Sequence, residues 1–325
     1  MLQPLVSVAI PAYNHEAYVR QAITSVINQT YQRLELIIID DGSQDNTWSV
    51  IQDMREVCES RFERFIMQTQ QNQGSCNTCT SLLSLCNGEY VALIASDDMY
   101  TPAAIERMVK TLEYATDAVL VVGINTIMDS DGRQAYWDAE HNIVYDKKQA
   151  AYTSFSDSIH KNSKPLDAAD WGTYSALIKG NHIPNGYLIR RAALTDIVPF
   201  TPEAPLEDWW LMMQLSKKGR FINIDEPTFM YRWHSSNTMH QKEKIQKYGS
   251  LTLEWEEHSL RQSNDAKHWE IFKQAYTSLK VYLNLGIIKF FRRRIGKLER
   301  LMIFQIGSKE IILSRRLKKI NRKHK

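Results

Sequence analysis

The chain has 325 residues, which is enough for one large domain or two domains of ordinary size. Hydrophobic residues make up 43% of it and charged residues 24%, with only 13 Gly and 9 Pro, so the composition excludes a collagenous or wholly disordered chain. The formal net charge is +3, but residues 289–325 carry 14 Lys/Arg and two Asp/Glu, which leaves residues 1–288 at −9. The basic character therefore belongs to the C-terminal end.

Short apolar runs alternate with amphipathic stretches over the first 125 residues. The runs Leu5–Ile10 and Leu34–Ile39 have the length of buried strands, and between them Glu16–Gln29 repeats apolar residues at steps of three and four, as a helix does. The alternation continues with expected helices at 46–58, 77–86 and 101–114 and expected strands at 64–69, 90–95 and 118–123. Repeated strand–helix–strand units predict an α/β fold with a mostly parallel central sheet and helices on both faces.

Beyond about residue 125 the pattern becomes aromatic, polar and interrupted by Pro and Gly. The sequence predicts strands at 187–190 and 229–233 and a helix at 208–218. From about residue 245 the pattern is helical, with apolar positions such as Phe291 and Met302 on one face and basic residues around them. We therefore expect one domain over residues 1–245, with halves at 1–125 and 126–245, and a helical, basic C-terminal region over 246–325.

The four cysteines lie at positions 58, 76, 79 and 86. Cys76 and Cys79 have the spacing of half a zinc or redox site, but no second pair completes a ligand set, so we interpret them as reduced thiols in a reducing cytosol. The N-terminus lacks a basic region, and Pro4 and Pro11 interrupt its apolar run, so we expect no signal peptide. No apolar run approaches the ~20 residues that cross a bilayer, so any membrane role is expected to be peripheral.

Polar clusters follow three of the expected strands. They are Pro11–Asn14 after the first, Asp40–Ser43 after the second and Ser96–Asp98 after the fourth. In doubly wound sheets, ligands bind beyond the carboxyl ends of strands, so these clusters are expected to share a site. A dinucleotide oxidoreductase would carry GxGxxG after the first strand, and a P-loop enzyme would carry GxxxxGK(S/T). The chain has neither motif, and it has no GxSxG hydrolase elbow.

The acidic pairs are suited to a nucleotide sugar. An aspartate at a strand end accepts hydrogen bonds from a base or ribose, and adjacent carboxylates hold a hard divalent cation that neutralises a diphosphate. For Asp40 and Asp41, a solvated Asp-Gly turn is an equally good interpretation. For Asp97 and Asp98, the alternative is a cap for the helix that begins near Thr101.

Four segments resemble, in order, the successive motifs of family 2 glycosyltransferases with the GT-A fold. The segments are Val6–Asn14, Leu36–Thr47, Asn72–Gly74 and Gly88–Asp98, and the resemblance extends over roughly residues 4–235. It implies a Rossmann-like, mostly parallel central sheet flanked by helices. It also implies that residues 1–125 bind the nucleotide sugar and that residues 126–245 bind the acceptor.

The resemblance further implies where a UDP-sugar and its cation bind. Tyr13 and Asp41 would contact the uracil or ribose and Asp97 the sugar or ribose, while Asp98 would hold Mn²⁺ or Mg²⁺ between the phosphates. The residues expected to bind the nucleotide sugar are Pro11, Tyr13, Asp40, Asp41, Asn72, Gly74, Asn77, Ser96, Asp97 and Arg232. His234 would be a second metal ligand, although a structural histidine is an equally good interpretation.

The segment Leu206–Trp210 resembles the Glu-Asp motif that supplies the base in inverting members. An acceptor hydroxyl is a poor nucleophile at neutral pH, so a carboxylate within hydrogen-bond reach must take its proton. We expect Asp208 to be that base and Glu207 to orient it or the acceptor, while acidic capping of the following helix is the alternative. Trp209 and Trp210 would stack on a sugar ring, and the alternative is that one of them packs in the core.

The basic C-terminal region has two interpretations. Clusters at Arg292–Arg294 and Arg315–Lys319 on amphipathic sequence suit an anionic membrane surface, at ~1 kcal/mol per basic residue near it. The alternative is a solvated helix face. Nucleic-acid binding is not expected, because the rest of the chain is net acidic and has no recognised module.

These expectations describe a metal-dependent inverting glycosyltransferase. It would transfer a hexose, as glucose, galactose or an N-acetylhexosamine, from a UDP-sugar to a hydroxyl of a sugar-diphospho-undecaprenol-type acceptor. By family resemblance, the setting is bacterial O-antigen, lipopolysaccharide or other surface polysaccharide synthesis at the cytoplasmic face of the inner membrane. The alternative is a catalytically idle GT-A domain that serves as a membrane-bound scaffold or nucleotide-sugar sensor, and the intact acids at Asp97, Asp98 and Asp208 argue against it.

Overall fold

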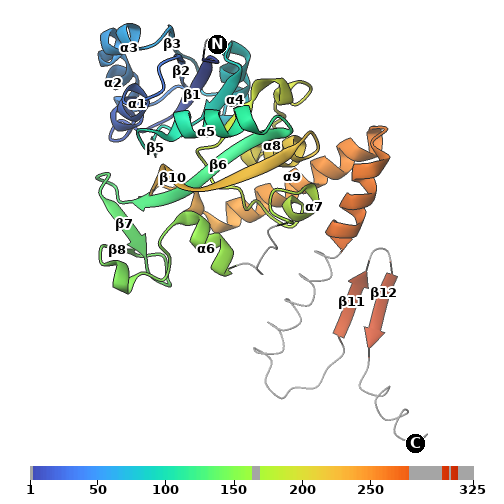
Figure 1. Ribbon diagram of the computed structural model, residues 1–325. Coiled ribbons are helices and arrows are strands. Elements are labelled where there is room, and N and C mark those ends of the chain that lie inside the picture. Colours follow the sequence, from blue (N-terminus) through green and yellow to red (C-terminus); the bar gives the residue numbers. More distant parts are fainter. Residues whose placement is uncertain (1–2, 163–168, 278–301, 307–308, 314–325) are drawn as a thin grey trace, which may run out of the picture. The chain divides into compact units, whose positions relative to one another are not determined.

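The computed structural model describes residues 3–162, 169–277, 302–306 and 309–313. The chain divides into two units, Met1–Ala275 and Tyr276–Lys325. The larger unit is built around one sheet, and Figure 1 shows helices packed along it. In the described ranges, no helix is long and apolar enough to cross a membrane.

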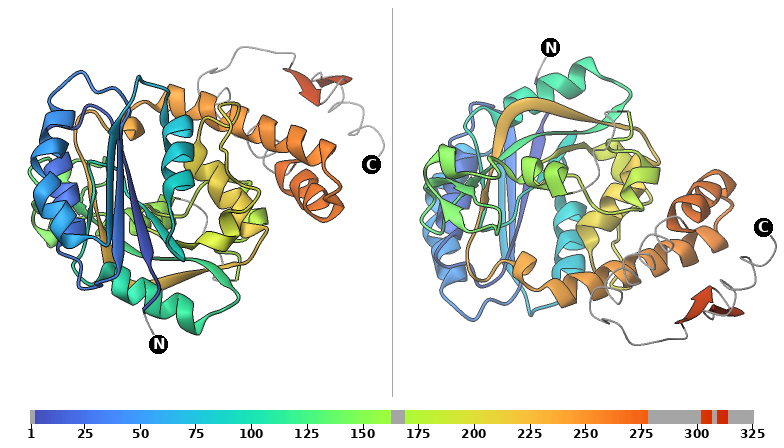
Figure 2. Two further views of the ribbon diagram at one scale, coloured as in Figure 1. Left: turned by 90° about the horizontal axis from the view of Figure 1, so that it is seen from above. Right: turned by 90° about the horizontal axis from the view of Figure 1, so that it is seen from below.

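The first half of the sheet is parallel. Strand β1 pairs with β2 on one side and β4 on the other, and β2 pairs with β3. Helices α1–α3 cover one face of these strands and α4 covers the other (Figure 2). The elements are β1 (Val6–Ala12), α1 (Val19–Ile27), β2 (Leu34–Asp40), α2 (Thr47–Asp53), α3 (Arg55–Arg61), β3 (Arg64–Thr69), α4 (Ser75–Leu85) and β4 (Tyr90–Leu93). Because β1 and β2 are covered on both faces, their sequences are almost uninterrupted apolar runs.

Beyond β4 the sheet is mixed. Strand β9 runs antiparallel to both β4 and β6, β10 runs parallel to β6, and β5 is antiparallel to β10. The order across the sheet is β3-β2-β1-β4-β9-β6-β10-β5. The elements are β5 (Met99–Tyr100), α5 (Ala104–Tyr114), β6 (Ala118–Met128), β9 (Leu188–Arg190), α8 (Glu207–Ser216) and β10 (Arg220–Arg232). The predicted mostly parallel α/β sheet is confirmed, with β6 and β10 longer than predicted.

Several short elements carry no clear pattern in the sequence. They are β7 (Gln134–Trp137), β8 (Ile143–Val144), α6 (Phe155–Asn162), α7 (Tyr174–Leu177) and the 3-10 helices η1 (Lys147–Gln149), η2 (Arg191–Leu194) and η3 (Thr238–His240). Strand β7 pairs with both β6 and β8. Trp137, Tyr152 and Tyr231 bury together with Ile127 in a second, aromatic core. Elements this short hold too few residues to show a helical or strand period.

The helical prediction for residues 46–58 is only partly right, because two helices, α2 and α3, meet at Met54. Ile51, Met54 and Cys58 all bury in the main core. After β10, helix α9 (Lys242–Gln262) and a helix over residues 266–277 confirm the helical pattern for that part of the chain. The larger unit extends to Ala275, so it includes α9.

In the smaller unit, β11 (Met302–Ile306) and β12 (Lys309–Leu313) form an antiparallel strand pair. The helical prediction for this stretch is therefore wrong. The physical reason lies in its composition, because four of the ten strand residues are β-branched isoleucines, and Gly307-Ser308 between them is a two-residue hairpin signal. The helix predicted around Phe291 falls outside the described residues.

The strand order determines where the loops of the site meet. The chain leaves β1 toward β2 and β3 and later returns to β4 on the other side of β1. The carboxyl ends of β1 and β4 therefore flank the topological switch point, where open α/β sheets bind ligands. Since β9 is antiparallel to both β4 and β6, and β10 is parallel to β6, strand β10 ends at the same edge.

A buried carboxylate ties the first strands together. Glu35 on β2 is fully buried and accepts hydrogen bonds from Ser7 Oγ, from the backbone N–H of Asn87 at 2.6 Å and from Arg64 Nη1 at 2.7 Å. Burial alone would raise the pKa of Glu35, but these hydrogen bonds outweigh it, so the pKa lies below its ordinary value. The carboxylate is therefore ionised at neutral pH and links β1, β2, β3 and the turn before β4.

We expect Glu35→Ala to lower the free energy of unfolding by about 3–5 kcal/mol, because it leaves buried donors without an acceptor. Since the pKa is lower in the folded than in the unfolded protein, this stabilisation is lost as the pH falls through the folded-state value. Urea unfolding measures the change. Glu63→Ala is the matched control, because Glu63 pairs with Arg33 at an exposed site and is worth no more than about 1 kcal/mol. Equal losses in the two variants would contradict the account.

Candidate active site

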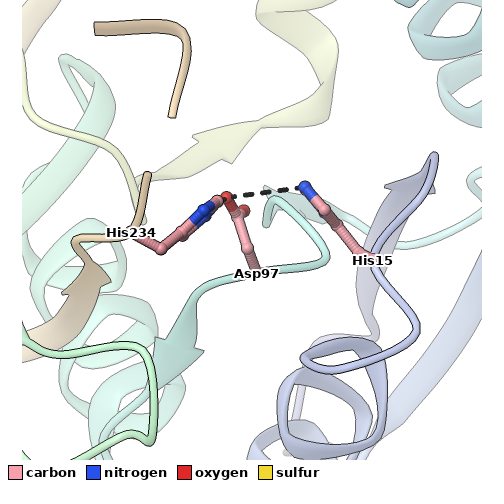
Figure 3. Close-up of side chains that lie close together, drawn as sticks. All are labelled: His15, Asp97 and His234. Carbon is pink, nitrogen blue, oxygen red and sulfur yellow. Dashed lines mark hydrogen bonds and ion pairs between the residues drawn. The ribbon is translucent and has the colours of Figure 1, made fainter. Parts of the chain in front are cut away.

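Three side chains from distant parts of the sequence meet at this edge of the sheet (Figure 3). His15 follows β1, Asp97 follows β4 and His234 follows β10. Asp97 Oδ2 lies 3.0 Å from His234 Nε2 and 3.9 Å from His15 Nε2, and the three ligand atoms lie within 4.8 Å of one another. Two imidazole nitrogens and one carboxylate oxygen at such separations form a donor set for one divalent cation.

Two hydroxyl groups orient the imidazole rings. Ser96 Oγ lies 2.8 Å from His15 Nδ1, and Ser236 Oγ lies 2.8 Å from His234 Nδ1, so both rings present Nε2 toward Asp97. Metal-binding histidines are commonly oriented in this way. Burial lowers the pKa of His15. Burial alone would raise the pKa of Asp97, but the hydrogen bond from His234 and the charges of both histidines outweigh it and lower that pKa. An ionised carboxylate beside a neutral imidazole suits a divalent cation.

Asp98 has a different partner. Its Oδ1 accepts the backbone N–H of Arg232 at 2.9 Å, and its side chain is buried. Burial, and then the charge of Asp97, raises the pKa of Asp98 well above its ordinary value. Asp98 and His234 are the metal ligands expected from the sequence. Among the described residues, the structure groups His234 with Asp97 and with His15, which the sequence does not single out.

Arg232 lies beneath the cluster rather than in it. Its side chain is fully buried, and each guanidinium nitrogen has a protein partner. Nε donates to Asp97 O at 2.6 Å, Nη1 to Ser130 O at 2.8 Å and Nη2 to Gln21 Oε1 at 2.8 Å. The guanidinium also packs over the Tyr18 ring, 5.0 Å from its centre. The expectation that Arg232 clamps a diphosphate is therefore corrected, because the structure uses its donors to fix the acidic loop after β4.

Asp40 and Asp41 brace the loops around the end of β2. Asp40 accepts hydrogen bonds from Ser43 Oγ at 2.5 Å and Thr69 Oγ1 at 2.9 Å. Asp41 accepts the backbone N–H of Gly74 at 2.9 Å, which fixes the loop before α4. Both aspartates are buried, so the alternative of a solvated turn is wrong.

The other residues expected to bind the donor lie along the same edge. Tyr13 is 45% exposed just after β1, and Asn72 is exposed in the loop before α4. Asn77 on α4 donates from Nδ2 to the backbone carbonyl four residues earlier at 3.0 Å. Pro11 belongs to β1, and Gly74 precedes α4 with a φ of +81°, a conformation that favours glycine. The exposed ring of Tyr13 is free to stack on a base.

Glu207 and Asp208 begin helix α8, and both are partly buried. Asn181 Nδ2 donates to Asp208 Oδ2 at 3.2 Å, and the amide is itself oriented because its Oδ1 accepts the backbone N–H of Ile183. Burial raises the pKa of Asp208. Burial, and then the charge of Asp208, raises the pKa of Glu207 to about 7. Neighbouring carboxyl groups with raised pKa values are suited to proton transfer near neutral pH.

The tryptophans that follow these acids are structural. Trp209 and Trp210 are buried, and Trp209 Nε1 donates to Leu177 O at 2.8 Å. The alternative that they pack in the core is confirmed. Leu206 occupies the N-cap of α8, and no side chain caps the helix there. Glu207 and Asp208 lie in the first turn, and Asp208 Oδ1 accepts the backbone N–H of Trp209 at 2.7 Å, so an interaction with the helix start stands beside the catalytic interpretation.

One tyrosine lies within electrostatic reach of both groups of acids. Burial, and then the charges of Asp98, Asp97 and Asp208, raises the pKa of Tyr231 on β10. The charges of the carboxylates after β4 and of the carboxylate at the start of α8 therefore act on the same buried side chain.

The four cysteines are free and buried. Burial raises the pKa of Cys76 to about 12 and the pKa of Cys79 well above its ordinary value, so both are protonated thiols at neutral pH. Helix α4 lies between the loop after β2 and the segment before α8, because Gly74 donates to Asp41 at 2.9 Å and Cys76 Sγ lies 3.9 Å from Ala204 O.

Comparison with known proteins identifies the family. Residues 7–163 match the model of Glycosyl transferase family 2. An uncharacterized glycosyltransferase of Haemophilus influenzae is 31% identical over 240 residues, which cover 72% of this chain and 67% of that protein. The chain belongs to glycosyltransferase family 2. Hyaluronan synthase of Pasteurella multocida is 34% identical over 246 residues, which cover 75% of this chain but only 22% of the synthase.

Solved structures of low sequence identity share the fold. TarS residues 1–349 from S. aureus, in complex with UDP-GlcNAc, superpose with a TM-score of 0.57 at 16% identity, covering 95% of this chain and 99% of that one. Mannosyltransferase PcManGT from Pyrobaculum calidifontis, in complex with GDP-Man and Mn²⁺, gives a TM-score of 0.60 at 13% identity, covering 86% of this chain and 70% of that one. The GT-A fold expected for this family 2 glycosyltransferase is confirmed.

Two side chains of the site are absent from the sequence prediction. His15 comes one residue after Pro11–Asn14, so its place at the end of the first strand was an available signal. Asn181 lies 27 positions before Asp208, and nothing in the local sequence links the two.

Proposed function

We propose that this family 2 glycosyltransferase is a metal-dependent, inverting enzyme that transfers a hexose or N-acetylhexosamine from a UDP-sugar to an acceptor hydroxyl. The observation that carries the proposal is that Asp97 lies 3.0 Å from His234 after β4 and β10, while Asn181 holds Asp208 at 3.2 Å at the start of α8. One group of side chains suits a cation that binds a diphosphate, and the other suits removal of a proton. These are the two tasks of the reaction.

In the proposed mechanism, Asp208 takes the proton of the acceptor hydroxyl. The acceptor oxygen forms a bond to the anomeric carbon on the face opposite the nucleotide. The bond from that carbon to the phosphate oxygen breaks, UDP leaves with the electron pair, and the configuration inverts. Asn181 holds the base in position through its hydrogen bond to Oδ2, and Glu207 lies beside the base in sequence.

On the donor side, Asp97 and His234 would hold the cation, which supplies positive charge to the diphosphate as the sugar–phosphate bond breaks. Tyr13 would stack on the base, because its ring is exposed beside the switch point. Asp98 and Arg232 act beneath the site by fixing the loop that carries Asp97. Fold relatives solved with UDP-GlcNAc, or with GDP-Man and Mn²⁺, support a nucleotide-sugar donor and a divalent cation.

The acceptor is proposed to be a sugar-diphospho-undecaprenol-type lipid at the cytoplasmic face of the inner membrane, in synthesis of O-antigen or another surface polysaccharide. The 14 Lys/Arg against two Asp/Glu over residues 289–325 support attraction to an anionic membrane surface. The similarity to a hyaluronan synthase supports a polysaccharide product.

The raised pKa values of the acidic pair predict a pH dependence. As the pH falls, protonation removes the base, so we expect kcat/KM to fall between pH 7 and the ordinary carboxyl value of about 4. Asn181→Leu should move this fall in kcat/KM to higher pH, because it removes a hydrogen bond that favours the ionised form of Asp208. Profiles of kcat/KM against pH test both statements. A wild-type kcat/KM that falls only at or below pH 4 would contradict the assignment of Asp208 as the base.

Ligand-dependent thermal unfolding tests the donor class. The purified protein is heated with UDP, GDP or dTDP, each with and without Mn²⁺, since a ligand at 100 times its Kd adds about 2.7 kcal/mol. We expect stabilisation by UDP that requires Mn²⁺ and is lost in Asp97→Ala. Stabilisation by GDP or dTDP alone would change the donor, and the absence of any stabilisation would contradict a nucleotide site.

Transfer itself is tested with UDP-sugars and a synthetic lipid-diphosphate sugar as acceptor. NMR of the product reports the anomeric configuration, and an α-linked donor should yield a β-linked product. Retention of configuration would contradict the inverting mechanism. Nucleotide binding without transfer across a broad acceptor panel would favour the idle scaffold or sensor.

A further inference from the structure

We propose that His15 is a third protein ligand of the divalent cation, beside Asp97 and His234. The centre then offers two imidazole nitrogens and one carboxylate oxygen (Figure 3). The inference rests on the proposed function, because the cation is the one that would meet the donor diphosphate. His15 would be a ligand from the loop after β1, and its imidazole would make the centre prefer transition-metal ions over Mg²⁺.

His15 is held at two points. Its backbone N–H donates to Thr47 Oγ1 at 2.8 Å, and its ring Nδ1 lies 2.8 Å from Ser96 Oγ. The remaining ring nitrogen, Nε2, faces Asp97 Oδ2 at 3.9 Å. This separation is too long for a hydrogen bond. The hydrogen bonds to Thr47 and Ser96 fix the position of the His15 ring. The space that remains between His15 Nε2 and Asp97 Oδ2 is suited to an ion that both atoms bind.

The separations agree with ligation. Ligand atoms about 2.1 Å from one ion lie roughly 3.0–3.4 Å apart when they are neighbours in octahedral or tetrahedral geometry. The 3.0 Å between Asp97 Oδ2 and His234 Nε2 already has this value. His15 Nε2 is 3.9 Å from Asp97 Oδ2 and within 4.8 Å of His234 Nε2, so ligation requires a movement of about 1–1.5 Å. The Tyr18 ring lies 4.7 Å from the His234 ring and 5.8 Å from the His15 ring, so it lines one side of the cluster.

A second imidazole changes which ions the centre prefers. Mg²⁺ favours oxygen ligands and keeps its water, whereas imidazole nitrogens bind Zn²⁺ and Co²⁺ well and Mn²⁺ less tightly. Of the two Asp98 oxygens, Oδ1 already accepts the Arg232 backbone N–H at 2.9 Å, so Asp98 offers the centre at most its other oxygen. The centre should therefore bind transition-metal ions before any nucleotide is present.

The test is titration of the metal-free, full-length protein with Co²⁺ in the absence of nucleotide, followed by visible d–d absorption and calorimetry. We expect the wild type to bind Co²⁺ more tightly than Mg²⁺. His15→Ala should lose at least about 10-fold in Co²⁺ affinity, the lower end of what loss of even an outer-shell partner costs. Asp98→Asn should retain Co²⁺ binding. His258→Ala, on the exposed surface of α9, is the matched control and should bind as the wild type does.

Co²⁺ affinity of His15→Ala within about twofold of the wild type would overturn the proposal. Thermal unfolding of metal-free His15→Ala and His15→Asn separates loss of a ligand from misfolding. The Co²⁺ affinity of whichever variant unfolds like the wild type is then the one compared with the wild type. A wild type that binds a UDP-sugar with Mg²⁺ but shows no Co²⁺ absorption would overturn the nitrogen-rich centre and leave the proposed function intact. Co²⁺ binding that depends on His15 without any nucleotide binding would support the centre and contradict the proposed function.

Discussion

Replacement of Asp208 by asparagine is expected to lower kcat for sugar transfer by about 10²–10⁴-fold, the usual contribution of a general base. The amide has nearly the same shape as the carboxylate, but it cannot take a proton at neutral pH. Its single oxygen can accept one of the two hydrogen bonds that Asp208 accepts, from Asn181 Nδ2 or from the Trp209 backbone N–H. The donor meets Asp97 and Tyr13 on other loops, so UDP affinity should stay close to the wild-type value. Initial transfer rates at saturating donor, with UDP binding by calorimetry, measure the two effects separately.

Two further variants serve as comparisons for Asp208→Asn. Glu203→Gln changes an exposed acid just before the motif and should leave kcat unchanged. Glu207→Gln should lower kcat less than Asp208→Asn, because Glu207 assists the base and does not replace it. A rate for Asp208→Asn within about 10-fold of the wild type would remove Asp208 from the role of base. Parallel losses of kcat and UDP affinity would indicate a structural defect instead.

The sequence predicts the first half of the fold well for a physical reason. Strands covered on both faces must be apolar throughout, so β1 and β2 stand out, and the strand predicted at 64–69 coincides with β3. Parallel strands also place their carboxyl ends at one edge, so the sequence predicts the position of the acidic loops. The short β7, β8 and α7 could not be predicted, because long-range packing rather than a local period specifies them.

The roles of individual side chains depend on geometry that residue types do not reveal. Asp97 and Asp98 are chemically identical neighbours, but the backbone after β4 directs one to His234 and the other to the N–H of Arg232. An arginine near an expected diphosphate matches phosphate chemistry, yet Arg232 donates to the backbone carbonyls of Asp97 and Ser130. Only the strand order brings His15 beside them.

Arg232→Met is therefore expected to lower the free energy of unfolding by at least about 3 kcal/mol. The substitution leaves the buried Asp97 O without its donor, at about 1–3 kcal/mol, removes the part-buried hydrogen bonds to Ser130 O and Gln21 Oε1, and takes a positive charge from beside Asp97 and Asp98. The loop that carries Asp97 loses its main support, so transfer activity should fall as well. The effect is large because a domain is stable by only about 5–15 kcal/mol in total.

Urea unfolding followed by tryptophan fluorescence measures this loss. Arg220→Met is the matched control, because Arg220 begins the same strand and pairs with Asp117 where both side chains are exposed, a pair worth no more than about 1 kcal/mol. Arg232→Lys keeps the charge, but its three N–H donors share one nitrogen and cannot replace the separate Nε, Nη1 and Nη2, so it should lie between the wild type and Arg232→Met. If Arg232 held the diphosphate instead, Arg232→Met would unfold like the wild type and bind UDP more weakly, and that result would restore the donor-binding role expected from the sequence.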